Sequence, residues 1–344
     1  MPGPRVAVAM SGGVDSSTAA AILKEKGYQV FGVTMHLSPN DPGDGIESAG
    51  AVASLLGIPH HVIDFRDVFA KRIISGFCRE YQRGRTPNPC IFCNQHIKFG
   101  ALLDAVRQMG AVYLATGHYA RIERDSRYRL LKGVDTAKDQ SYFLYRLGQD
   151  QLKYLILPVG DKHKSEVKKL AAMLGLPAAE RKESQDICFL PGNDYRSFLA
   201  QYMTFVPGDI VDTDGNILGR HDGLAGYTIG QRQGLRVSSK QKLYVLKLDM
   251  AGNRVLVGTE EHLLKDRLIA GDLSWIAGEA PAANFLAMAR VRYRSVEAIA
   301  TVHLEDNRAK VRFEQPQRAV APGQSIVFYR GDDVLGGGII EDIL

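Results

Sequence analysis

A run of seven residues near the start of the chain, Ser11 to Ser17 (Ser-Gly-Gly-Val-Asp-Ser-Ser), restricts the fold more than any other segment. It follows a short apolar run at 5–10 and overlaps a segment, Val14 to Lys26, that favours a helix ending at Gly27. Adjacent glycines let the backbone approach a ligand closely, and a helix amino end offers unpaired N–H groups to an anion. The sequence therefore predicts a phosphate-binding loop between a strand and a helix. It is not a Walker A loop, which carries Lys-Ser/Thr after its second glycine.

Strand and helix patterns alternate after this loop. Strands are expected at 28–35, 61–65 and 111–116, and helices at 46–56 and 99–109. Such alternation indicates an α/β domain with a doubly wound parallel sheet and ligand-binding loops at the carboxyl ends of its strands. Short strands and turns dominate later, and the last part of the chain, including an expected strand at 287–294, predicts a small β-barrel. For 344 residues we expect a catalytic domain at 1–200, a central domain at 201–268 and a barrel at 269–344.

The composition and charge narrow the class of protein. No apolar run is long enough to span a membrane and no secretory signal opens the chain, so we expect a cytoplasmic protein without a membrane partner. The net charge is +5; residues 66–85 hold six Lys or Arg against two acids, and residues 285–330 hold eight against four. Either segment alone could be an ordinary solvated face. Beside a nucleotide loop, the two together favour a nucleic-acid partner.

The loop is similar to the signature of the ATP-pyrophosphatase-loop family, whose members cleave ATP between its α- and β-phosphates and adenylate an oxygen. The resemblance implies ATP and Mg²⁺ as cofactors, with Asp15 holding the metal or positioning a serine as part of the catalytic apparatus. Met35 is expected near the adenine, where a core methionine would also fit. The expected ATP-binding residues are Ala9, Met10, Ser11, Gly12, Gly13, Val14, Asp15, Ser16, Met35 and Gly117.

Several separated motifs resemble one branch of that family, the tRNA-specific 2-thiouridylases. These motifs are Gly84–Pro89 running into Cys93-Asn94 and Lys98-Phe99, Ala115–Tyr119, Lys138–Leu144, Ser184–Phe189, Val291–Arg294, Pro322–Gln324 and Gly336–Glu341. The resemblance covers nearly the whole chain. It implies an adenine nucleotide alpha hydrolase-like domain, a small middle domain and a barrel. It also implies adenylation of the C2 oxygen of the wobble uridine, followed by sulfur transfer that gives 2-thiouridine, AMP and pyrophosphate.

The same resemblance gives two cysteines distinct roles. Cys188 would carry a persulfide supplied by an upstream sulfur-relay protein, and a persulfide is a strong sulfur nucleophile that a second thiol can cleave. Cys93 would be that thiol, either releasing sulfide or closing a disulfide with Cys188, after which a reductant restores the pair. A small buried residue is the ordinary alternative for any one cysteine.

The resemblance further implies contacts with the anticodon stem–loop, whose splayed bases a modifying enzyme can reach. His118 would border the RNA, and Arg292, Tyr293 and Arg294 would alternate on a barrel strand, placing two cations on one face and a ring on the other. The expected tRNA-binding residues are His118, Lys138, Asp139, Gln140, Arg292, Tyr293 and Gln324. A packed histidine, a solvated loop and a strand that merely confers solubility are the alternatives.

Cys90 departs from the family pattern, in which many members carry Asp at this position. It forms Cys-x-x-Cys with Cys93. Three interpretations are open. Cys90 is a harmless variant, or it is a redox partner that lowers the pKa of the Cys93 thiol, or it joins Cys93 and Cys188 as a ligand of an iron–sulfur cluster. The loop 38–46 is also shorter than in many relatives. Two rival functions keep part of the pattern: an ATP-dependent adenylating ligase for a small metabolite, and an RNA-binding or iron–sulfur sensor without catalysis.

Overall fold

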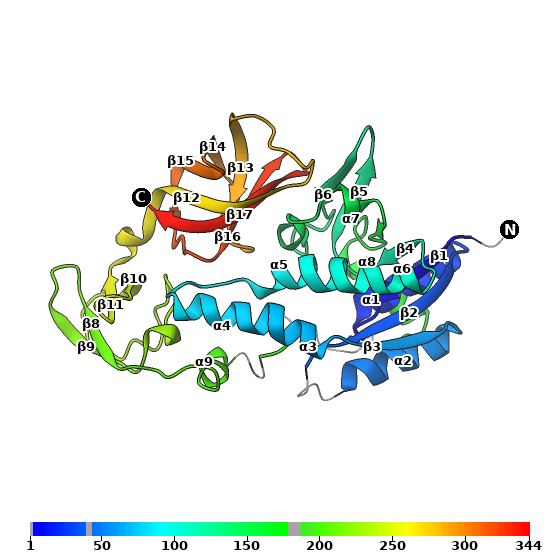
Figure 1. Ribbon diagram of the computed structural model, residues 1–344, viewed down its shortest axis with the longest axis horizontal. Coiled ribbons are helices and arrows are strands. Elements are labelled where there is room, and N and C mark those ends of the chain that lie inside the picture. Colours follow the sequence, from blue (N-terminus) through cyan, green and yellow to red (C-terminus); the bar gives the residue numbers. More distant parts are fainter. Residues whose placement is uncertain (1–2, 39–42, 178–186, 191, 193) are drawn as a thin grey trace.

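The amino-terminal domain is built on five parallel strands in the order β3-β2-β1-β4-β7 (Figure 1). The computed structural model describes residues 3–38, 43–177, 187–190, 192 and 194–344. The strands are β1 (Arg5–Ala9), β2 (Gln29–His36), β3 (His60–Asp64), β4 (Tyr113–Ala115) and β7 (Leu155–Ile156). Val6, Ala7 and Val8 of the central strand are fully buried, because helices cover both faces of the sheet. The predicted α/β class with a doubly wound sheet is confirmed.

Helices on the two faces bury different residues of the same strand. Val6 and Val8 pack toward α1 (Val14–Glu25), α2 (Asp44–Leu56) and α8 (Lys164–Met173), whereas Ala7 packs toward the helix that ends as α6 (Leu102–Gln108). This alternation is the period of two that a strand imposes on its side chains. It leaves the loop between β1 and α1 at the carboxyl edge of the sheet, where open α/β sheets bind ligands.

Two long helices lie side by side across the middle of the molecule (Figure 1). Each contains a π-helical segment, which appears often at functional sites. The first, called the helical arm below, consists of α3 (Arg66–Phe69), η1 (Ala70–Ile74) and α4 (Ser75–Gln82). The second consists of α5 (Pro89–Cys93), η2 (Asn94–Ala101) and α6. It begins where the side chain of Asn88 accepts a hydrogen bond from the Cys90 N–H, with Pro89 at the first helical position.

A middle domain and a barrel follow. The middle sheet has the order β10-β11-β8-β9, with strands β8 (Gly208–Val211), β9 (Ile217–His221), β10 (Tyr244–Asp249) and β11 (Arg254–Gly258). Short helices α9 (Tyr195–Leu199), η6 (Leu224–Gly226) and η7 (Glu260–Leu263) flank it. The barrel strands are β12 (Leu264–Trp275), β13 (Asn284–Arg290), β14 (Ala298–Glu305), β15 (Arg308–Arg318), β16 (Ser325–Arg330) and β17 (Asp333–Ile343), closed by pairing of β12 with β17. The predicted middle domain and β-barrel are confirmed.

A hairpin that the sequence analysis missed joins the first domain to the barrel. Strands β5 (Ala120–Arg124) and β6 (Tyr128–Lys132) extend the barrel sheet, because β6 pairs with β17 at Leu131 and Asp333. The segments η3 (Ser141–Leu144) and α7 (Gln149–Leu152) follow it and bury Tyr142 and Tyr145 against barrel residues such as Val327. One apolar core therefore runs continuously from the sheet of the first domain into the barrel.

The expected strand at 287–294 is wrong over its second half. Strand β13 ends at Arg290, and Arg292 to Ser295 form a turn. The Ser295 hydroxyl accepts from the Arg292 N–H at 3.2 Å and donates to the Arg292 carbonyl at 2.9 Å, which satisfies locally the groups that a strand would share with a neighbour. In the described part of the chain, no helix combines the length and apolar character needed to cross a membrane.

Candidate active site

The predicted phosphate loop occupies the expected place between β1 and α1. Gly13 is the residue before the helix, and no side chain caps that helix end. Gly12 has φ +72°, a left-handed conformation that glycine adopts without steric cost. The Ser16 hydroxyl accepts from the Ser11 N–H at 3.2 Å and donates to the Gly13 carbonyl at 3.1 Å. The loop is thus held in shape from inside, and the first N–H groups of α1 remain available for an anion.

Residues around the loop fix its position. The Met10 N–H bonds to the Val33 carbonyl at 2.8 Å, and the Thr34 hydroxyl donates to the Met10 carbonyl at 2.9 Å. Gly117 lies against the other side of the loop, where a Cβ would come within 2.6 Å of the Ser16 backbone nitrogen. Only glycine fits there without displacing α1. Ala9 and Val14 continue β1 and α1 on either side of the loop.

Asp15 is held by two residues that the sequence analysis missed. The Lys164 ammonium bonds both carboxylate oxygens, at 2.6 and 2.7 Å, and the Tyr119 hydroxyl donates to one of them at 2.7 Å. Lys164 begins α8, and its side chain is only 10% exposed. The carboxylate thus accepts three hydrogen bonds from the protein, while its side chain remains 31% exposed. Lys164 also places a cation beside the phosphate loop.

The cysteines gather around the start of the second long helix. Cys93 is 7% exposed and packs in a cluster with Phe77, Ile97 and Phe189, and all four cysteines are free thiols. Burial raises the pKa of the Cys93 thiol to about 12, Lys98 lowers it, and the neighbouring Cys188 and Cys90 thiols raise it further. Cys188 is exposed, and its chain neighbours Ile187 and Phe189 pack in the same cluster as Cys93. Ser184, Gln185 and Asp186 of the same motif lie outside the described residues, as do residues 39–42 of the short loop.

Met35 connects the thiol cluster with the nucleotide side of the domain. It is the next-to-last residue of β2 and packs both against the core of the sheet and against the cluster that contains Cys93. His118 follows β4 on the same edge, with its ring 5.6 Å from that of Phe99 and its Nδ1 2.8 Å from the Thr116 hydroxyl. Burial, with a smaller effect from Lys98, holds the pKa of His118 well below its usual range, so the imidazole is neutral.

Lys98 is the cation of this site, although the sequence assigned it no role. Its charge opposes the burial that raises the pKa of Cys90 and Cys93, and it adds to the burial that lowers the pKa of His118. It lies on η2, which begins directly after Cys93. A π turn brings residues five apart onto one side of the helix, unlike an α turn, so Cys93 and Lys98 share that side. Its place in the Lys98-Phe99 motif was the signal that could have identified it.

We expect Lys98→Met to weaken the Cys93 thiolate. Loss of the ammonium raises the pKa of Cys93 further, and a higher pKa leaves less thiolate at any given pH, so alkylation and thiolation should both need higher pH. Site-resolved mass spectrometry of Cys93 alkylation by iodoacetamide, as a function of pH, measures this. Lys98→Arg keeps the charge and is the control. An alkylation profile of Lys98→Met that matches the parent would contradict this role.

In the segment 138–140, which was expected to contact RNA, two side chains form hydrogen bonds within the protein. Asp139 is buried and accepts bonds from the N–H groups of Gly133 and Ser141, from the Ser141 hydroxyl and from Arg290. Gln140 accepts from the Tyr119 N–H at 3.0 Å. These two side chains therefore order the loop from within. Lys138, between Asp135 and Asp139, is half-buried.

The barrel residues of the predicted RNA surface lie at the junction with the other domains. Tyr293 packs on Phe143 with ring centroids 4.3 Å apart, and Arg292 donates to the Ile229 carbonyl at 2.9 Å. The Gln324 amide donates to the Thr86 carbonyl at 2.8 Å and so ties the barrel to the loop before α5. These three residues lie on the turn after β13 and on the turn before β16, rather than along one strand.

Four charged side chains lock the barrel onto the first domain. Arg290 bonds Asp139 at 3.1 Å and Glu297 at 2.8 Å, and Glu297 bonds Lys132 at 2.6 Å. None of the four side chains is more than 16% exposed. We call this set the interdomain charge network. Because it includes Asp139, it also fixes the 138–140 segment relative to the turn that carries Arg292 and Tyr293.

Metal binding through the three cysteines finds no support in their arrangement. Within the described residues, which include Cys90, Cys93 and Cys188, no three His, Cys, Asp or Glu side chains form a set that could hold a metal ion. The alternative of a cluster bound by these three thiols is therefore not favoured by the geometry.

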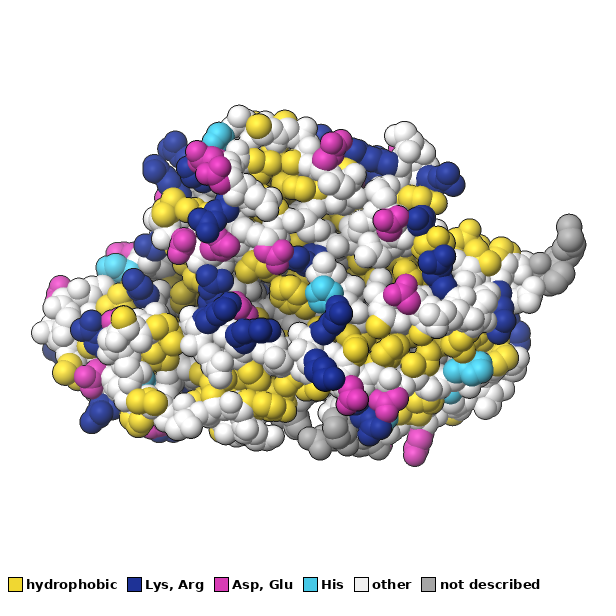
Figure 2. Space-filling model, in the orientation of Figure 1, with side chains coloured by type: hydrophobic (Ala, Val, Ile, Leu, Met, Phe, Trp, Pro, Cys, Tyr) yellow, Lys and Arg dark blue, Asp and Glu magenta, His cyan; other side chains and the backbone are white. Residues whose placement is uncertain are grey.

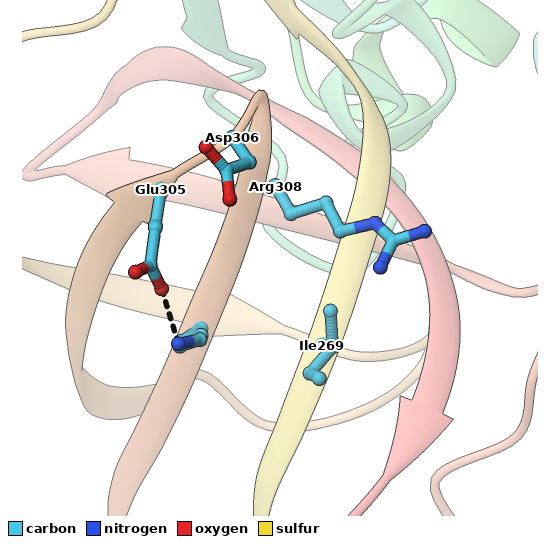
Figure 3. A pocket seen from close by; sticks show the side chains of 5 residues that line it. Ile269, Glu305, Asp306 and Arg308 are labelled. Atoms are coloured by element: carbon cyan, nitrogen blue, oxygen red, sulfur yellow. Dashed lines mark hydrogen bonds and ion pairs between the residues drawn. The ribbon is translucent and has the colours of Figure 1, made fainter.

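Two surface cavities of similar size differ in character. The first, of about 460 Å³, lies on the barrel, where Lys310 pairs with Glu305 (Figure 3). Arg308, which also lines it, pairs with Glu341. Its charges are thus balanced internally. The second, of about 450 Å³, lies between the helical arm and the barrel and includes residues of the basic segment 66–85. Figure 2 shows Lys and Arg side chains gathered at the centre of this face.

Known proteins resemble the chain along almost its full length. Residues 4–192 match the profile described as the tRNA methyl transferase HUP domain, 196–259 the tRNA methyl transferase PRC-barrel domain, and 265–340 the aminomethyltransferase beta-barrel domain. The amino-terminal domain is thus of the HUP class, which agrees with its parallel sheet and the loop after β1. A solved 4-thiouridine synthetase–RNA complex with bound ATP overlaps it only in part, with a TM-score of 0.39 and 16% identity over 58% of this chain and 50% of that one.

Curated relatives define the family. The tRNA-specific 2-thiouridylase MnmA 1 of Caldanaerobacter subterraneus subsp. tengcongensis is 47% identical, with 98% of each chain covered. The tRNA-specific 2-thiouridylase MnmA of Moorella thermoacetica is 49% identical, covering 98% of this chain and 99% of its own. The chain belongs to the tRNA-specific 2-thiouridylase family, as its motifs predicted.

Proposed function

We propose that this chain is an ATP-dependent sulfurtransferase that converts the wobble uridine of tRNA to 2-thiouridine. The proposal rests on one observation: the phosphate loop and the thiol cluster lie at the same edge of one sheet. A phosphate loop with an open helix end lies after β1, and a cluster containing Cys93, with Cys188 beside it, packs on Met35 at the end of β2. Adenylation needs the phosphate loop and sulfur transfer needs the thiols, and both must be within reach of the same base.

In the first step the uridine C2 oxygen attacks the α-phosphate of ATP, and pyrophosphate leaves. The phosphates would lie on the N–H groups of Gly12 to Ser16, and Lys164, now paired with Asp15, supplies a cation at the same place. Mg²⁺ would be held by the phosphates together with the partly exposed Asp15 carboxylate. The neutral His118 ring borders the base without adding charge.

In the second step sulfur replaces the adenylated oxygen. The terminal sulfur of a Cys188 persulfide attacks C2, the C2–O bond breaks and AMP departs with the oxygen. The Cys93 thiolate then attacks Sγ of Cys188, which breaks the sulfur–sulfur bond, leaves sulfur on C2 and closes a Cys93–Cys188 disulfide. A two-electron thiol reductant restores both thiols. Because Cys93 is protonated in the free chain, binding of the substrate must favour its thiolate, and Lys98 is the nearby cation that does so.

The substrate and partners follow from the same chemistry. The anticodon stem–loop of tRNA is the polyanion, contacted by Lys138, Arg292, Tyr293 and Gln324, and a persulfide-carrying relay protein charges the exposed Cys188. We place the reaction in the cytoplasm and assign the catalytic, central and barrel domains to 1–200, 201–268 and 269–344. Two profile descriptions name methyl transfer, but a buried thiol pair beside a phosphate loop suits activation and sulfur transfer better than it suits methyl donation.

The nucleoside formed decides the proposal. The full chain is incubated with unmodified tRNA, ATP and a persulfide donor, and the digested tRNA is analysed by mass spectrometry. We expect 2-thiouridine, with AMP and pyrophosphate released in equal amounts and only when tRNA is present. Pyrophosphate release that responds to small amines and not to tRNA would favour the metabolite ligase, and a methylated nucleoside would favour methyl transfer. Activity in protein that contains no iron would exclude an obligatory cluster.

A further inference from the structure

The cavity between the helical arm and the barrel has a polar rim and an apolar floor. We call it the arm cavity. Its volume is about 450 Å³; Lys71, Arg72 and Arg79 of the arm lie on its lining, and the apolar part includes Phe77 and Phe92. The Gln324–Thr86 bond and Gly323 close the side formed by the barrel. A cavity of this size suits a small planar group and not a folded protein surface.

The rim carries unbalanced positive charge. In the described part of the chain, the side chains of Lys71, Arg72 and Arg79 form no hydrogen bond or ion pair, and all three residues are exposed. The acids of the lining are already paired: Glu80 with Arg83 at 3.2 Å, Asp272 with Arg146 at 2.9 Å and Glu341 with Arg308 at 3.1 Å. Arg72 and Arg79 both belong to the lining, so they lie on the side of the arm that faces the cavity. This contrasts with the barrel cavity, where cations and acids neutralise each other.

The apolar part presents aromatic rings beside the reactive thiol. Phe92 and His96 are one helical turn apart, with centroids at 6.3 Å and planes within 11°. The Arg146 guanidinium lies 5.3 Å over the Phe92 ring. Burial, with smaller effects of Arg72 and Arg146, lowers the pKa of His96, so its ring is neutral. Phe92 immediately precedes Cys93, and consecutive Cα atoms are about 3.8 Å apart, less than the length of one nucleotide.

We propose that the arm cavity binds a nucleotide adjacent to the target uridine, with its base against Phe92 and His96 and its phosphates on Lys71, Arg72 and Arg79. The inference rests on the proposed function, which brings a single-stranded anticodon loop to Cys93. Stacking on rings and contact with phosphates by unpaired cations are the two features of single-strand binding sites, and both tolerate any base. The subsite would hold the loop in place while the neighbouring uridine reaches the thiols.

An anticodon stem–loop with 2-aminopurine on either side of the target uridine tests the subsite in the full chain. The parent should quench one of the two probes, and Phe92→Leu, which keeps apolar volume but removes the ring, should abolish that quench and weaken binding by about 5- to 100-fold. A plot of log affinity against log salt concentration has a negative slope, and Arg72→Gln/Arg79→Gln should make that slope shallower by about 1.4. Arg124→Gln/Arg127→Gln, which removes two exposed arginines at the tip of the β5–β6 hairpin, should leave the slope unchanged.

The outcomes separate the subsite from the proposed function. If the parent forms 2-thiouridine but neither probe is quenched, or the slope is unaltered in Arg72→Gln/Arg79→Gln, the subsite is disproved while the function stands. The same holds if the hairpin control lowers the slope equally, because the effect is then one of net charge. If the parent forms no 2-thiouridine, the proposed function itself fails. Thermal unfolding of Phe92→Leu shows whether a lost quench reflects lost folding, in which case the salt slope decides alone.

Discussion

Replacing either Cys93 or Cys188 by serine is expected to lower 2-thiouridine formation by more than about 10³-fold, since loss of a nucleophile removes a covalent step. The affinity for tRNA should not change, because Cys93 is buried in an apolar cluster and Cys188 is uncharged as a thiol. Liquid chromatography with mass spectrometry of tRNA digests measures the product, and filter binding measures the affinity. The two variants should differ in one respect: Cys93→Ser retains a persulfide on Cys188 after reaction with the donor, and Cys188→Ser carries none there.

Cys78→Ser is the matched control for this pair. Cys78 lies in the same cluster as Cys93, is 6% exposed and has no assigned role, so its replacement should keep thiolation apart from a modest loss of stability. Cys90→Asp, which restores the residue that many relatives carry, addresses the third thiol. Full activity of Cys90→Asp would make Cys90 a tolerated variant. Thiolation by Cys93→Ser at the parent rate would disprove the two-cysteine mechanism.

Arg290→Met is expected to be the most destabilising single change in the interdomain charge network. It leaves Asp139 and Glu297 without their shared cation, and removing one partner from a buried ion pair costs about 3 kcal/mol or more. The midpoint of thermal unfolding should therefore fall by roughly 4–7 °C. Because Asp139 also orders residues 133–141, the affinity for tRNA should fall at temperatures where the protein is still folded.

Arg236→Met provides the comparison. Arg236 and Asp222 form an ion pair in which the two side chains are 76% and 85% exposed, and exposed pairs contribute about 0–1 kcal/mol. Its unfolding midpoint should stay within about 1 °C of the parent. Equal midpoints for Arg290→Met and Arg236→Met would show that the buried network does not hold the barrel to the first domain.

The sequence was informative wherever local chemistry decides structure. Glycines, a strand and a helix start were enough to place the phosphate loop, and alternating patterns predicted the parallel sheet and the barrel. Partners that are distant in the chain could not be inferred. Lys164 meets Asp15 only after the chain has completed most of the first domain, and the role of Lys98 depends on a π turn that its residue types do not signal. Arg292 to Arg294 have the alternating pattern of a strand, but hydrogen bonds of the Ser295 hydroxyl hold them in a turn.

Burial explains the other difference between prediction and structure. Asp139 looks like a surface acid beside Lys138 in a polar segment, yet four donors surround it, and one of them comes from the barrel. Single-chain patterns carry no information on which loop a later domain will cover. The same reason applies to the β5–β6 hairpin, whose residues alternate weakly and whose partner strand is β17.

The pairing of β6 with β17 has a consequence for synthesis on the ribosome. Strand β6 emerges early, whereas β17 is translated long afterwards. Until β17 is made, one edge of the hairpin has unpaired N–H and C=O groups. Such long-range pairing slows folding and exposes the nascent chain to aggregation. A message cut short before β17 would yield a chain that carries the residues of the phosphate loop and the thiol cluster but has an open sheet edge. Its apolar core would also be incomplete, because Val334 of β17 belongs to the core that the first sheet shares with the barrel.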